Sequence, residues 1–209
     1  MDALTNYLSA LNYPNINHKL YKTFWPASLH VIGKDILRFH AIYWPAFLLA
    51  AKIEPPKRIF GHGWILSGDE KMSKSTGNIL NPIEIVNNYG IDEIRYYLMK
   101  EVSHGNDGNI SLNSLEHCIN SDLANNYGNL CQRVFSFIKN NCNNSICKDG
   151  KLSEADNKII IQTEDLTKDL RNLMENQNLN NYIKSVINIS FLTNKYINDE
   201  EPWKLKKII

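Results

Sequence analysis

The chain has 209 residues, of which 43% are hydrophobic, and this is enough for one large or two small cores. A formal net charge of +1 excludes a uniformly basic surface, so any contact with nucleic acid must be local. The longest apolar run, residues 44–51, is far too short to span a membrane, and the N-terminal residues lack the basic start of a signal peptide.

The first third of the chain alternates between strand and helix patterns. Residues 28–33 (SLHVIG) predict a short buried strand, and residues 34–51 predict an aromatic-rich helix that Pro45 kinks or interrupts. Residues 58–66 (RIFGHGWIL) predict a second strand, followed by a turn at residues 67–69. Strand, helix and strand in this order indicate the βαβ unit of a parallel sheet.

The segment after residue 80 changes to a helical pattern. Asn81 supplies an N-cap and Pro82 suits the first helical position, so a helix is predicted to start here and to end at Gly90. Asp92 is expected to cap the next helix, which covers the sequence IDEIRYYLMKEV. These two short helices lead into the last part of the chain.

From Leu112 onward the patterns are helical only. A capping box is predicted at residues 153–156, and the predicted helices cover about 112–140, 154–176 and 178–198. The pattern changes near residues 105–112, so we expect two domains. These are an α/β domain over residues 1–108 and an all-α bundle over residues 109–209.

The cysteines give no sign of a metal site or a disulfide framework. Cys118, Cys131, Cys142 and Cys147 form no C-x-x-C pair. Reduced and mostly buried thiols are the interpretation that we prefer, because no secretory signal accompanies them. We therefore expect a cytoplasmic protein with no membrane segment and no zinc site in this chain.

One stretch, GDEKMSKSTGNIL at residues 68–80, has the composition of a functional loop. Lys71 and Lys74 lie among small hydroxyl side chains, and a glycine on each side lets the loop open and close. Lysines are compact charges on flexible stems, which suits them to a phosphate whose charge is changing. Because ligand-binding loops leave the carboxyl ends of strands in open α/β sheets, the position after a predicted strand indicates a phosphate-bearing substrate.

The five residues from Lys71 to Ser75 read KMSKS, and this part of the chain resembles class I aminoacyl-tRNA synthetases. The resemblance implies that the loop closes over the ATP triphosphate while the amino-acid carboxylate attacks the α-phosphorus. The catalytic residues that it implies are Lys71, Ser73 and Lys74, of which Lys74 is the more important lysine. The ATP-binding residues that it implies are Lys71, Met72, Ser73, Lys74, Ser75 and Asp35.

Longer stretches, among them DALTNYLSAL and FWPASLHVIGKDILRFHAIYWPAFLLAA, resemble the later catalytic half of bacterial methionyl-tRNA synthetases. Taken alone, an aromatic or a histidine on an apolar helix face indicates core packing. The resemblance implies instead a methionine pocket made by Tyr7, Asp35, His40 and Trp44. Trp44 follows His40 by one helical turn, so both can face this pocket. Aromatic rings and an imidazole suit a thioether, which offers polarizable contacts and a weak acceptor.

The helical part resembles the anticodon-binding bundle of the same family. Asn129 and Arg133 are one helical turn apart, and Trp203 follows Pro202 in the sequence DEEPW. The resemblance implies that these four residues read the CAU anticodon of tRNA(Met), with one base stacked on the tryptophan. Without the resemblance, a surface arginine and a tryptophan near a helix end would indicate ordinary structural residues.

The chain departs from the family because it has no H-x-G-H signature, which the family carries in the first half of its nucleotide fold. The family's zinc-bearing insertion would also lie upstream. In the family, a tryptophan of the methionine pocket comes directly before the position that Met1 fills here. We therefore expect a fragment that is truncated at both ends, with the later half of a Rossmann-type fold followed by an all-α anticodon-binding bundle. Its incomplete sheet would expose an edge and apolar surface, so we expect the isolated chain to be prone to aggregation. Without the H-x-G-H half, we also expect the chain alone to lack methionine-dependent exchange between ATP and pyrophosphate.

The activity that the resemblance implies is ATP-dependent formation of methionyl-adenylate and its transfer to tRNA(Met), with Mg²⁺ accompanying ATP. Two alternatives stay open: a non-catalytic tRNA-binding module that uses the bundle alone, and one part of a split synthetase with an N-terminal companion chain. A leucine-, valine- or isoleucine-type synthetase is disfavoured by the His40–Trp44 spacing together with the DEEPW ending.

Overall fold

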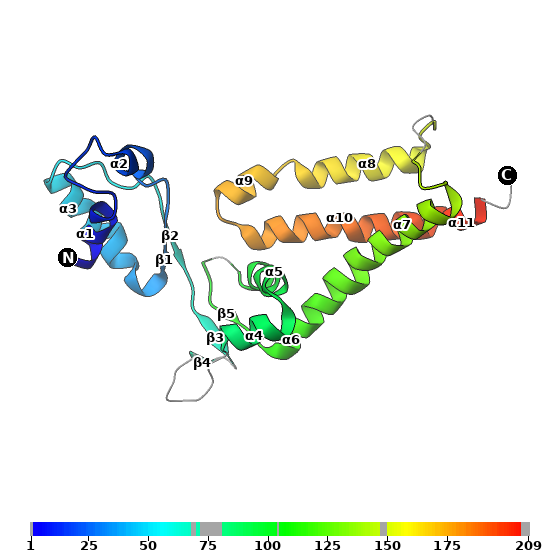
Figure 1. Cartoon of the computed structure of the whole chain (residues 1–209), viewed down its shortest axis with the longest axis horizontal. Coiled ribbons are helices and arrows are strands. Elements are labelled where there is room, and N and C mark those ends of the chain that lie inside the picture. Colours follow the sequence, from blue (N-terminus) through cyan, green and yellow to red (C-terminus); the bar gives the residue numbers. More distant parts are fainter. Residues whose placement is uncertain (1, 68–69, 72–80, 104, 147–149, 206–209) are drawn as a thin grey trace. The chain divides into compact units, whose positions relative to one another are not determined.

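The computed structural model describes residues 2–67, 70–71, 81–103, 105–146 and 150–205 (Figure 1). Packing divides the chain into two compact units, which are residues 1–65 with 105–108 and residues 66–104 with 109–209. We call them unit 1 and unit 2. They are defined by packing and not by function, so the predicted division into functional domains at residue 108 stays a prediction.

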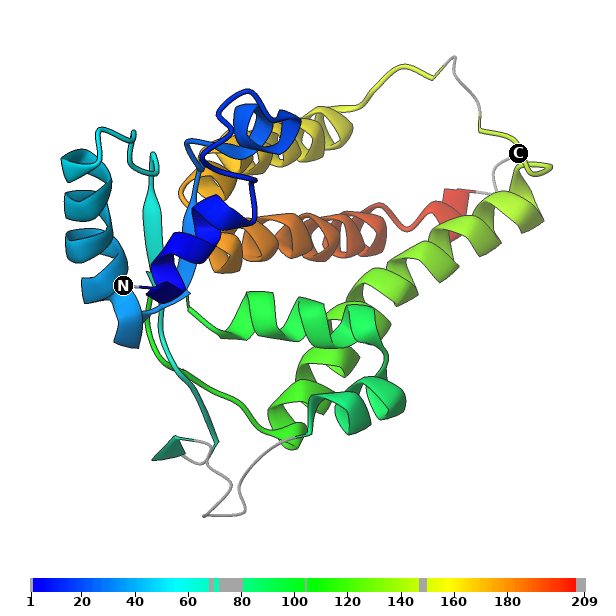
Figure 2. The ribbon, with the colours of Figure 1, turned by 60° about the vertical axis from the view of Figure 1, so that its left-hand side comes forward.

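Unit 1 contains a small parallel sheet. Strand β1 (His30–Gly33) pairs with β2 (Ile59–His62), and the register runs from His30 opposite Ile59 to Gly33 opposite His62. The two strands lie side by side in Figure 2. The βαβ order predicted from the sequence is therefore confirmed for these residues, and the strand ends place Gly33 and His62 at the same edge.

The connection between these strands is helical but not uniform. It consists of the 3-10 turn η1 (Lys34–Ile36), the π-helical segment η2 (Phe39–Tyr43) and helix α3 (Trp44–Ala50). Pro45 lies in the first turn of α3, and the helical backbone runs from η2 into α3 without a gap, so the predicted interruption at Pro45 is wrong. Just before it, the Trp44 N–H reaches back to the Phe39 carbonyl, five residues away, which is the wider π-helical bond.

The core of unit 1 forms where α1 (Asp2–Ser9) meets α2 (Lys19–Phe24) and α3. The buried residues of this cluster are Leu4, Leu8, Trp25, Trp44 and Leu48. Aromatic side chains bury large apolar areas, so the two tryptophans contribute much of this core. The core therefore places Trp44 in the interior of the unit, next to α1.

The predicted strand over residues 58–66 is wrong as a single element. Strand β2 ends at His62. A separate strand, β3 (Ile65–Ser67), pairs with β4 (Glu70–Lys71) and β5 (Gly108–Asn109). Between the two strands, Gly63 lies against the backbone of Asn106. A Cβ there would lie 2.1 Å from the Asn106 carbonyl oxygen, so only glycine allows this close approach.

Helices α4 (Pro82–Tyr89) and α5 (Ile91–Glu101) follow. The predicted start of α4 is confirmed, because the Asn81 side chain accepts the Ile83 N–H at 3.1 Å. The predicted cap at Asp92 is wrong, since α5 begins at Ile91 and Gly90 precedes it with φ of 93°. Asp92 lies instead in the first turn, where its charge still complements the helix dipole.

Unit 2 is otherwise a set of packed helices, and α10 (Leu179–Glu200) contacts most of the others. It packs against α5, α8 (Glu154–Thr167), α9 (Leu170–Glu175) and α7 (Asn129–Asn141). Figure 1 shows α8 running along α10. The remaining elements are α6 (Leu112–Cys118), the π-helical η3 (Ile119–Gly128) and α11 (Pro202–Leu205).

The predicted helices of unit 2 are confirmed in position, with two differences. The predicted helix over 154–176 is divided into α8 and α9, whereas the one over 112–140 is continuous but π-helical in its middle. The capping box at the start of α8 is confirmed, because Ser153 and Asp156 exchange hydrogen bonds between side chain and backbone. The described residues from Leu112 onward contain no strand.

Candidate functional site

Three of the residues predicted to line a methionine pocket meet in unit 1. The Tyr7 hydroxyl lies 3.0 Å from His40 Nε2, and His40 Nδ1 lies 3.0 Å from the Ile36 carbonyl oxygen. A carbonyl can only accept, so in the neutral imidazole Nδ1 carries the proton and Nε2 accepts the tyrosine hydroxyl proton. The ring of Tyr7 also lies 6.3 Å from that of Trp44, between centroids.

Two residues that sequence reasoning missed complete this aromatic cluster. His30 lies with its ring centroid 4.4 Å from that of Tyr7, and Trp25 contacts Trp44 edge-on at 6.4 Å. Burial lowers the pKa of His30, and the charge of His40 would lower it further. Both residues lie in the stretch FWPASLH, so their signal was an aromatic-rich segment that leads into a strand and ends at its first residue.

Two buried polar atoms in this cluster stand out. His30 Nδ1 and the indole nitrogen of Trp44 have no hydrogen-bond partner among the described residues. An unpaired buried polar group costs roughly 1–3 kcal/mol, so a polar group that reached either atom would bind favourably. Trp25 differs, because its indole N–H donates to the Glu54 carbonyl at 3.0 Å.

Asp35 lies in η1, directly after the carboxyl end of β1. Its Oδ1 would be 2.5 Å from a Cβ at Gly33, so the carboxylate folds over the Gly33 backbone. That hypothetical Cβ would also lie 4.0 Å from His62 Cε1, at the end of β2. The exposed Asp35 is therefore placed at the strand edge where α/β sheets bind ligands, and its predicted role in the methionine pocket stays a prediction.

The same edge carries an ion pair that the sequence did not reveal. Lys34 Nζ lies 2.5 Å from Asp107 Oδ1, and the same oxygen accepts the Trp64 backbone N–H at 2.8 Å. The Lys34 hydrogen bond, helped by the one from Trp64, lowers the pKa of the Asp107 carboxyl. Residues 34 and 107 are far apart in sequence, and no local pattern joins them.

The predicted catalytic loop falls almost entirely outside the described residues. Met72, Ser73, Lys74 and Ser75 lie outside them, and Lys71 is described by its backbone in β4, where it pairs with Leu66 of β3. The predicted roles of these residues stay predictions.

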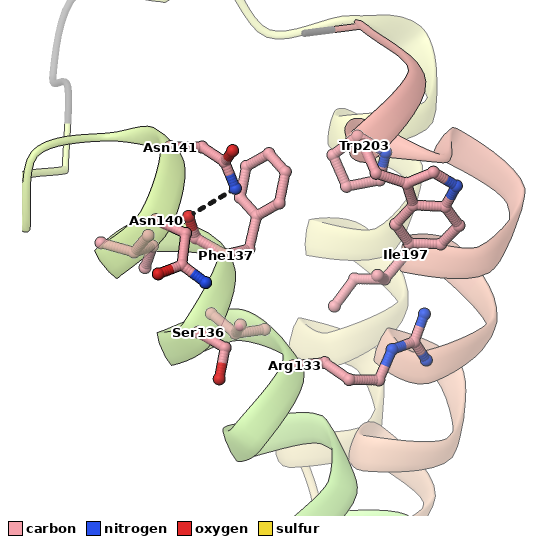
Figure 3. A pocket seen from close by; sticks show the side chains of 10 residues that line it. Arg133, Ser136, Phe137, Asn140, Asn141, Ile197 and Trp203 are labelled. Atoms are coloured by element: carbon pink, nitrogen blue, oxygen red, sulfur yellow. Dashed lines mark hydrogen bonds between the residues drawn. The ribbon is translucent and has the colours of Figure 1, made fainter.

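Unit 2 holds a separate pocket that brings Arg133 together with Pro202 and Trp203 (Figure 3). The pocket has a volume of about 480 Å³ and lies between α7 on one side and the end of α10 with α11 on the other. The Arg133 guanidinium carbon is 5.6 Å from the centre of the Trp203 ring, within the range of a cation–π contact. Trp203 is 44% exposed, so its ring remains accessible.

Asn129 is not brought into this pocket. It is exposed on α7, one turn before Arg133, and is not among the residues that line the cavity. Sequence reasoning in turn missed Asn194 and Asn198 of α10, whose side-chain oxygens accept from Arg133 at 3.5 and 2.7 Å. Their spacing of four residues on one helix is the signal that could have found them.

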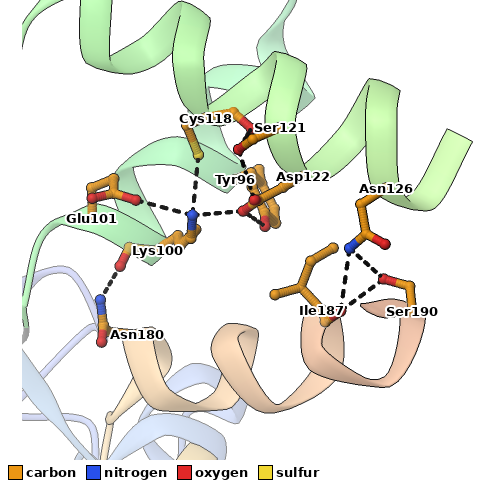
Figure 4. A network of polar contacts seen from close by, with 10 residues as sticks. All are labelled: Tyr96, Lys100, Glu101, Cys118, Ser121, Asp122, Asn126, Asn180, Ile187 and Ser190. Atoms are coloured by element: carbon orange, nitrogen blue, oxygen red, sulfur yellow. Dashed lines mark hydrogen bonds and ion pairs between the residues drawn. The ribbon is translucent and has the colours of Figure 1, made fainter. Parts of the chain in front are cut away.

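A polar network joins α5, α6 and η3 in the same unit (Figure 4). Lys100 Nζ lies 2.6 Å from Asp122 Oδ2, and the Tyr96 hydroxyl donates to the same oxygen at 2.6 Å. Burial alone would raise the pKa of Asp122, but the hydrogen bonds from Lys100, Tyr96 and Ser121 lower it overall. Burial raises the pKa of the Cys118 thiol to about 11, so this cysteine is a neutral core residue.

The chain is similar to known proteins over nearly its whole length. The family model described as tRNA synthetases class I (M) matches residues 1–135. The chain belongs to this family. It is 44% identical over 207 residues to a methionine–tRNA ligase of Brucella suis and 46% identical over 217 residues to one of Rickettsia bellii. The methionine-type match disfavours the leucine-, valine- and isoleucine-type alternative.

Solved structures of the family agree in fold. The chain superposes on the methionyl-tRNA synthetase of Mycobacterium tuberculosis in complex with methionyl-adenylate with a TM-score of 0.93 and 41% identity, and on the free form of that enzyme with 0.88 and 37%. In both comparisons 99% of this chain is covered, but only 40% of the synthetase. The chain likewise spans about two fifths of the length of the curated relatives it matches.

Two further findings concern the described residues alone. They contain no group of three histidine, cysteine, aspartate or glutamate side chains that could hold a metal ion. None of their helices combines the length and the apolar character needed to cross a membrane.

Proposed function

We propose that this chain forms the later catalytic part and the anticodon-binding helices of a methionine–tRNA ligase. The reaction would join methionine to AMP with release of pyrophosphate, and would then pass the methionyl group to tRNA(Met). The observation that carries the proposal is the joining of Tyr7, His40 and Trp44 by hydrogen bond and ring contacts, in a chain 44% identical to such a ligase.

The aromatic cluster suits a methionine side chain for a physical reason. A thioether makes polarizable contacts with ring faces and edges, and it accepts only weak hydrogen bonds. The Tyr7 hydroxyl, tied to His40 Nε2, is a fixed dipole, and the neutral imidazole adds no charge to desolvate. In this proposal Trp44 and His40 shape the pocket, while Asp35 at the strand edge faces the charged backbone of the amino acid or the adenosine.

The loop would supply the charge that the reaction needs. As the methionine carboxylate attacks the α-phosphorus, the bond to pyrophosphate breaks and negative charge moves onto the departing oxygens. Lys71 and Lys74 would stabilise that charge, and Ser73 would donate a hydrogen bond. Met72 and Ser75 would complete the loop contacts with ATP. Mg²⁺ bound to the ATP phosphates would offset part of the same charge.

The pocket around Trp203 would read the anticodon. An unpaired base could stack on the exposed ring, next to Pro202, while Arg133 donates to the base edge. Asn129 would have to act from the neighbouring turn of α7. We also propose that the chain acts in the cytoplasm, where tRNA, methionine and ATP are present together.

The chain alone would lack a complete ATP site, because the sequence has no H-x-G-H signature. We propose that methionine-dependent exchange between ATP and pyrophosphate needs further residues, on the same polypeptide or on an N-terminal companion chain. Clear exchange by these 209 residues alone would contradict this part of the proposal. A tRNA-binding module without catalysis is the second candidate, and it is favoured by the position of the whole Trp203 pocket within unit 2.

The decisive experiment measures binding of an anticodon stem-loop RNA with the sequence CAU, against the same RNA with its first anticodon base changed. Trp203→Ala should weaken the CAU complex by about 1–3 kcal/mol, the value of one base stacked on an aromatic ring. Phe135→Ala is the matched control, because Phe135 is an exposed aromatic of α7 that does not line the pocket. Equal binding by parent and Trp203→Ala would sink the proposed anticodon site.

A further inference from the structure

We infer that Asn194 and Asn198 of α10 are positioning residues, which hold the Arg133 guanidinium beside Trp203 for an unpaired RNA base. The inference rests on the proposed function and deepens it, because it names the side chains that prepare the site. Neither asparagine would itself touch the RNA.

The guanidinium is held from two directions. Nη2 donates to Asn198 Oδ1 at 2.7 Å, and Nη1 lies 3.5 Å from Asn194 Oδ1. The Trp203 ring lies against the guanidinium, with 5.6 Å between its centre and the Arg133 carbon. Arginine has five N–H donors, so others remain to bind the acceptors of a base edge. Two amides and a ring together restrict a side chain that would otherwise have many rotamers.

The orientation of Asn194 follows from its other contacts. Its Nδ2 donates to the Asn126 backbone oxygen at 3.0 Å and to Asn126 Oδ1 at 2.8 Å. A backbone oxygen only accepts, so the NH₂ group of Asn194 must face Asn126 and its Oδ1 must face Arg133. The amide is therefore fixed in the direction that serves the arginine.

Asn126 is in turn fixed by buried groups (Figure 4). Its Nδ2 donates to Ser190 Oγ at 2.9 Å, and Ser190 Oγ donates to the Ile187 carbonyl at 2.7 Å. Asn126 and Ser190 are 3% and 6% exposed, so this part of the chain of hydrogen bonds is shielded from water. The chain therefore runs from the interior between η3 and α10 to the pocket, and its fixed end is a backbone carbonyl.

The choice of amides over carboxylates also points to a ligand. None of the ion pairs between described residues involves Arg133, although its guanidinium is bound at both Nη atoms. A carboxylate in either place would hold the arginine equally well, but it would neutralise the charge and repel RNA phosphates. Neutral acceptors fix the guanidinium and leave its full positive charge for an electronegative partner.

The first test needs no RNA. The sequence has five arginines, Arg38, Arg58, Arg95, Arg133 and Arg171, so ¹⁵N relaxation of their Nε–H groups can be followed individually. Arg133→Lys assigns the Arg133 signal. We expect Asn198→Ala and Asn194→Ala to increase Arg133 motion on the picosecond–nanosecond scale towards that of the exposed Arg171. Asn198→Asp keeps the acceptor and should keep Arg133 rigid.

The second test measures selectivity. Each alanine variant should lower the preference for the CAU stem-loop over its changed counterpart by about tenfold, while binding of the changed RNA stays the same. A merely structural role would weaken both RNAs or neither. Asn188→Ala is the control, because Asn188 is an exposed asparagine of the same helix outside the pocket.

The two tests separate the inference from the function on which it rests. If the parent chain does not prefer CAU, the proposed function fails, and the relaxation data still decide whether the asparagines hold Arg133. If Arg133 keeps its rigidity in both alanine variants, the inference is overturned, whatever the RNA does. Retained CAU preference in both variants would also overturn it.

Discussion

The two candidate sites hold their tryptophans in opposite ways. In unit 1 Trp44 is 2% exposed and its neighbours are other rings, whereas in unit 2 Trp203 is 44% exposed and its neighbour is a guanidinium held by amides. A dry cluster of rings suits a small apolar group that can be enclosed. A half-exposed ring suits a base that remains part of a large, hydrated partner. The surroundings of an aromatic residue, more than its type, therefore indicate its ligand.

The largest expected effect concerns stability. Trp44→Ala should reduce the free energy of unfolding of unit 1 by about 3–5 kcal/mol, because it removes a buried ring from the core. Trp203→Ala should have a much smaller effect, since that ring is half exposed. Both losses can be measured by chemical denaturation in which amide hydrogen exchange reports the unfolding of each unit separately. Similar losses in the two variants would break the contrast between the sites.

A second test concerns the polar network of unit 2. Lys100→Met should cost about 3 kcal/mol of unfolding free energy, because it leaves the nearly buried Asp122 carboxylate without its cation. Lys184→Met, on the exposed side of α10, serves as the control and should change little. Denaturant midpoints report the difference. A negligible loss in Lys100→Met would mean that the network does not stabilise the packing of α5 against η3.

A smaller effect is expected from the hydroxyl that joins Tyr7 to His40. Tyr7→Phe keeps the ring but leaves the buried His40 Nε2 without its donor, which should cost about 1–3 kcal/mol. Tyr127→Phe, at an exposed tyrosine, is the matched control. Thermal unfolding provides the measurement, and equal stability of the two variants would show that the hydrogen bond adds nothing.

The smallest effect distinguishes the units by pH. Burial lowers the pKa of His30 in the folded state. The stability that neutral His30 gives to unit 1 is therefore fully present above the unfolded pKa of about 6.5, and it is lost as the pH falls below that value. The pKa of Asp122 is also lowered in the folded state. Because an unfolded aspartate titrates near pH 4, the stability that ionised Asp122 gives to unit 2 is lost only below about that pH. Unit 1 should therefore weaken at higher pH than unit 2, as measured by hydrogen exchange between pH 7 and 4. His30→Gln should remove this early loss.

Local sequence signals predicted local structure well. Asn81 and Pro82 start a helix because cap and proline act within one turn, and the period of the pattern located α10. The close approach at Gly63 could not be found in this way, because its partner is the backbone of Asn106, more than forty residues later. Likewise, Gly90 replaces the predicted cap at Asp92 because one positive-φ residue ends α4 and begins α5.

The sites depended on resemblance more than on pattern. Nothing in the residues around Arg133 indicates Trp203, seventy positions later, and only the likeness to a family joined them. Asn194 and Asn198 could not be recognised as partners of Arg133, because asparagine is so frequent in this chain that two more asparagines indicate no particular role. Asp35 was assigned to the methionine pocket by resemblance alone, and this assignment stays a prediction; its carboxylate lies over Gly33 at the strand edge. The roles of Lys71, Ser73 and Lys74 stay predictions.

The unequal burial of the tryptophans also divides the natural fluorescence of the chain. Trp25 and Trp44 are shielded, Trp64 is intermediate, and Trp203 is the most exposed of the four. A dissolved quencher such as iodide should therefore extinguish mainly the emission of Trp203, at the red edge of the spectrum. Any base that stacks on that ring would protect it from the quencher. The unmodified chain thus carries its own optical reporter of pocket occupancy, with the buried pair as an internal reference.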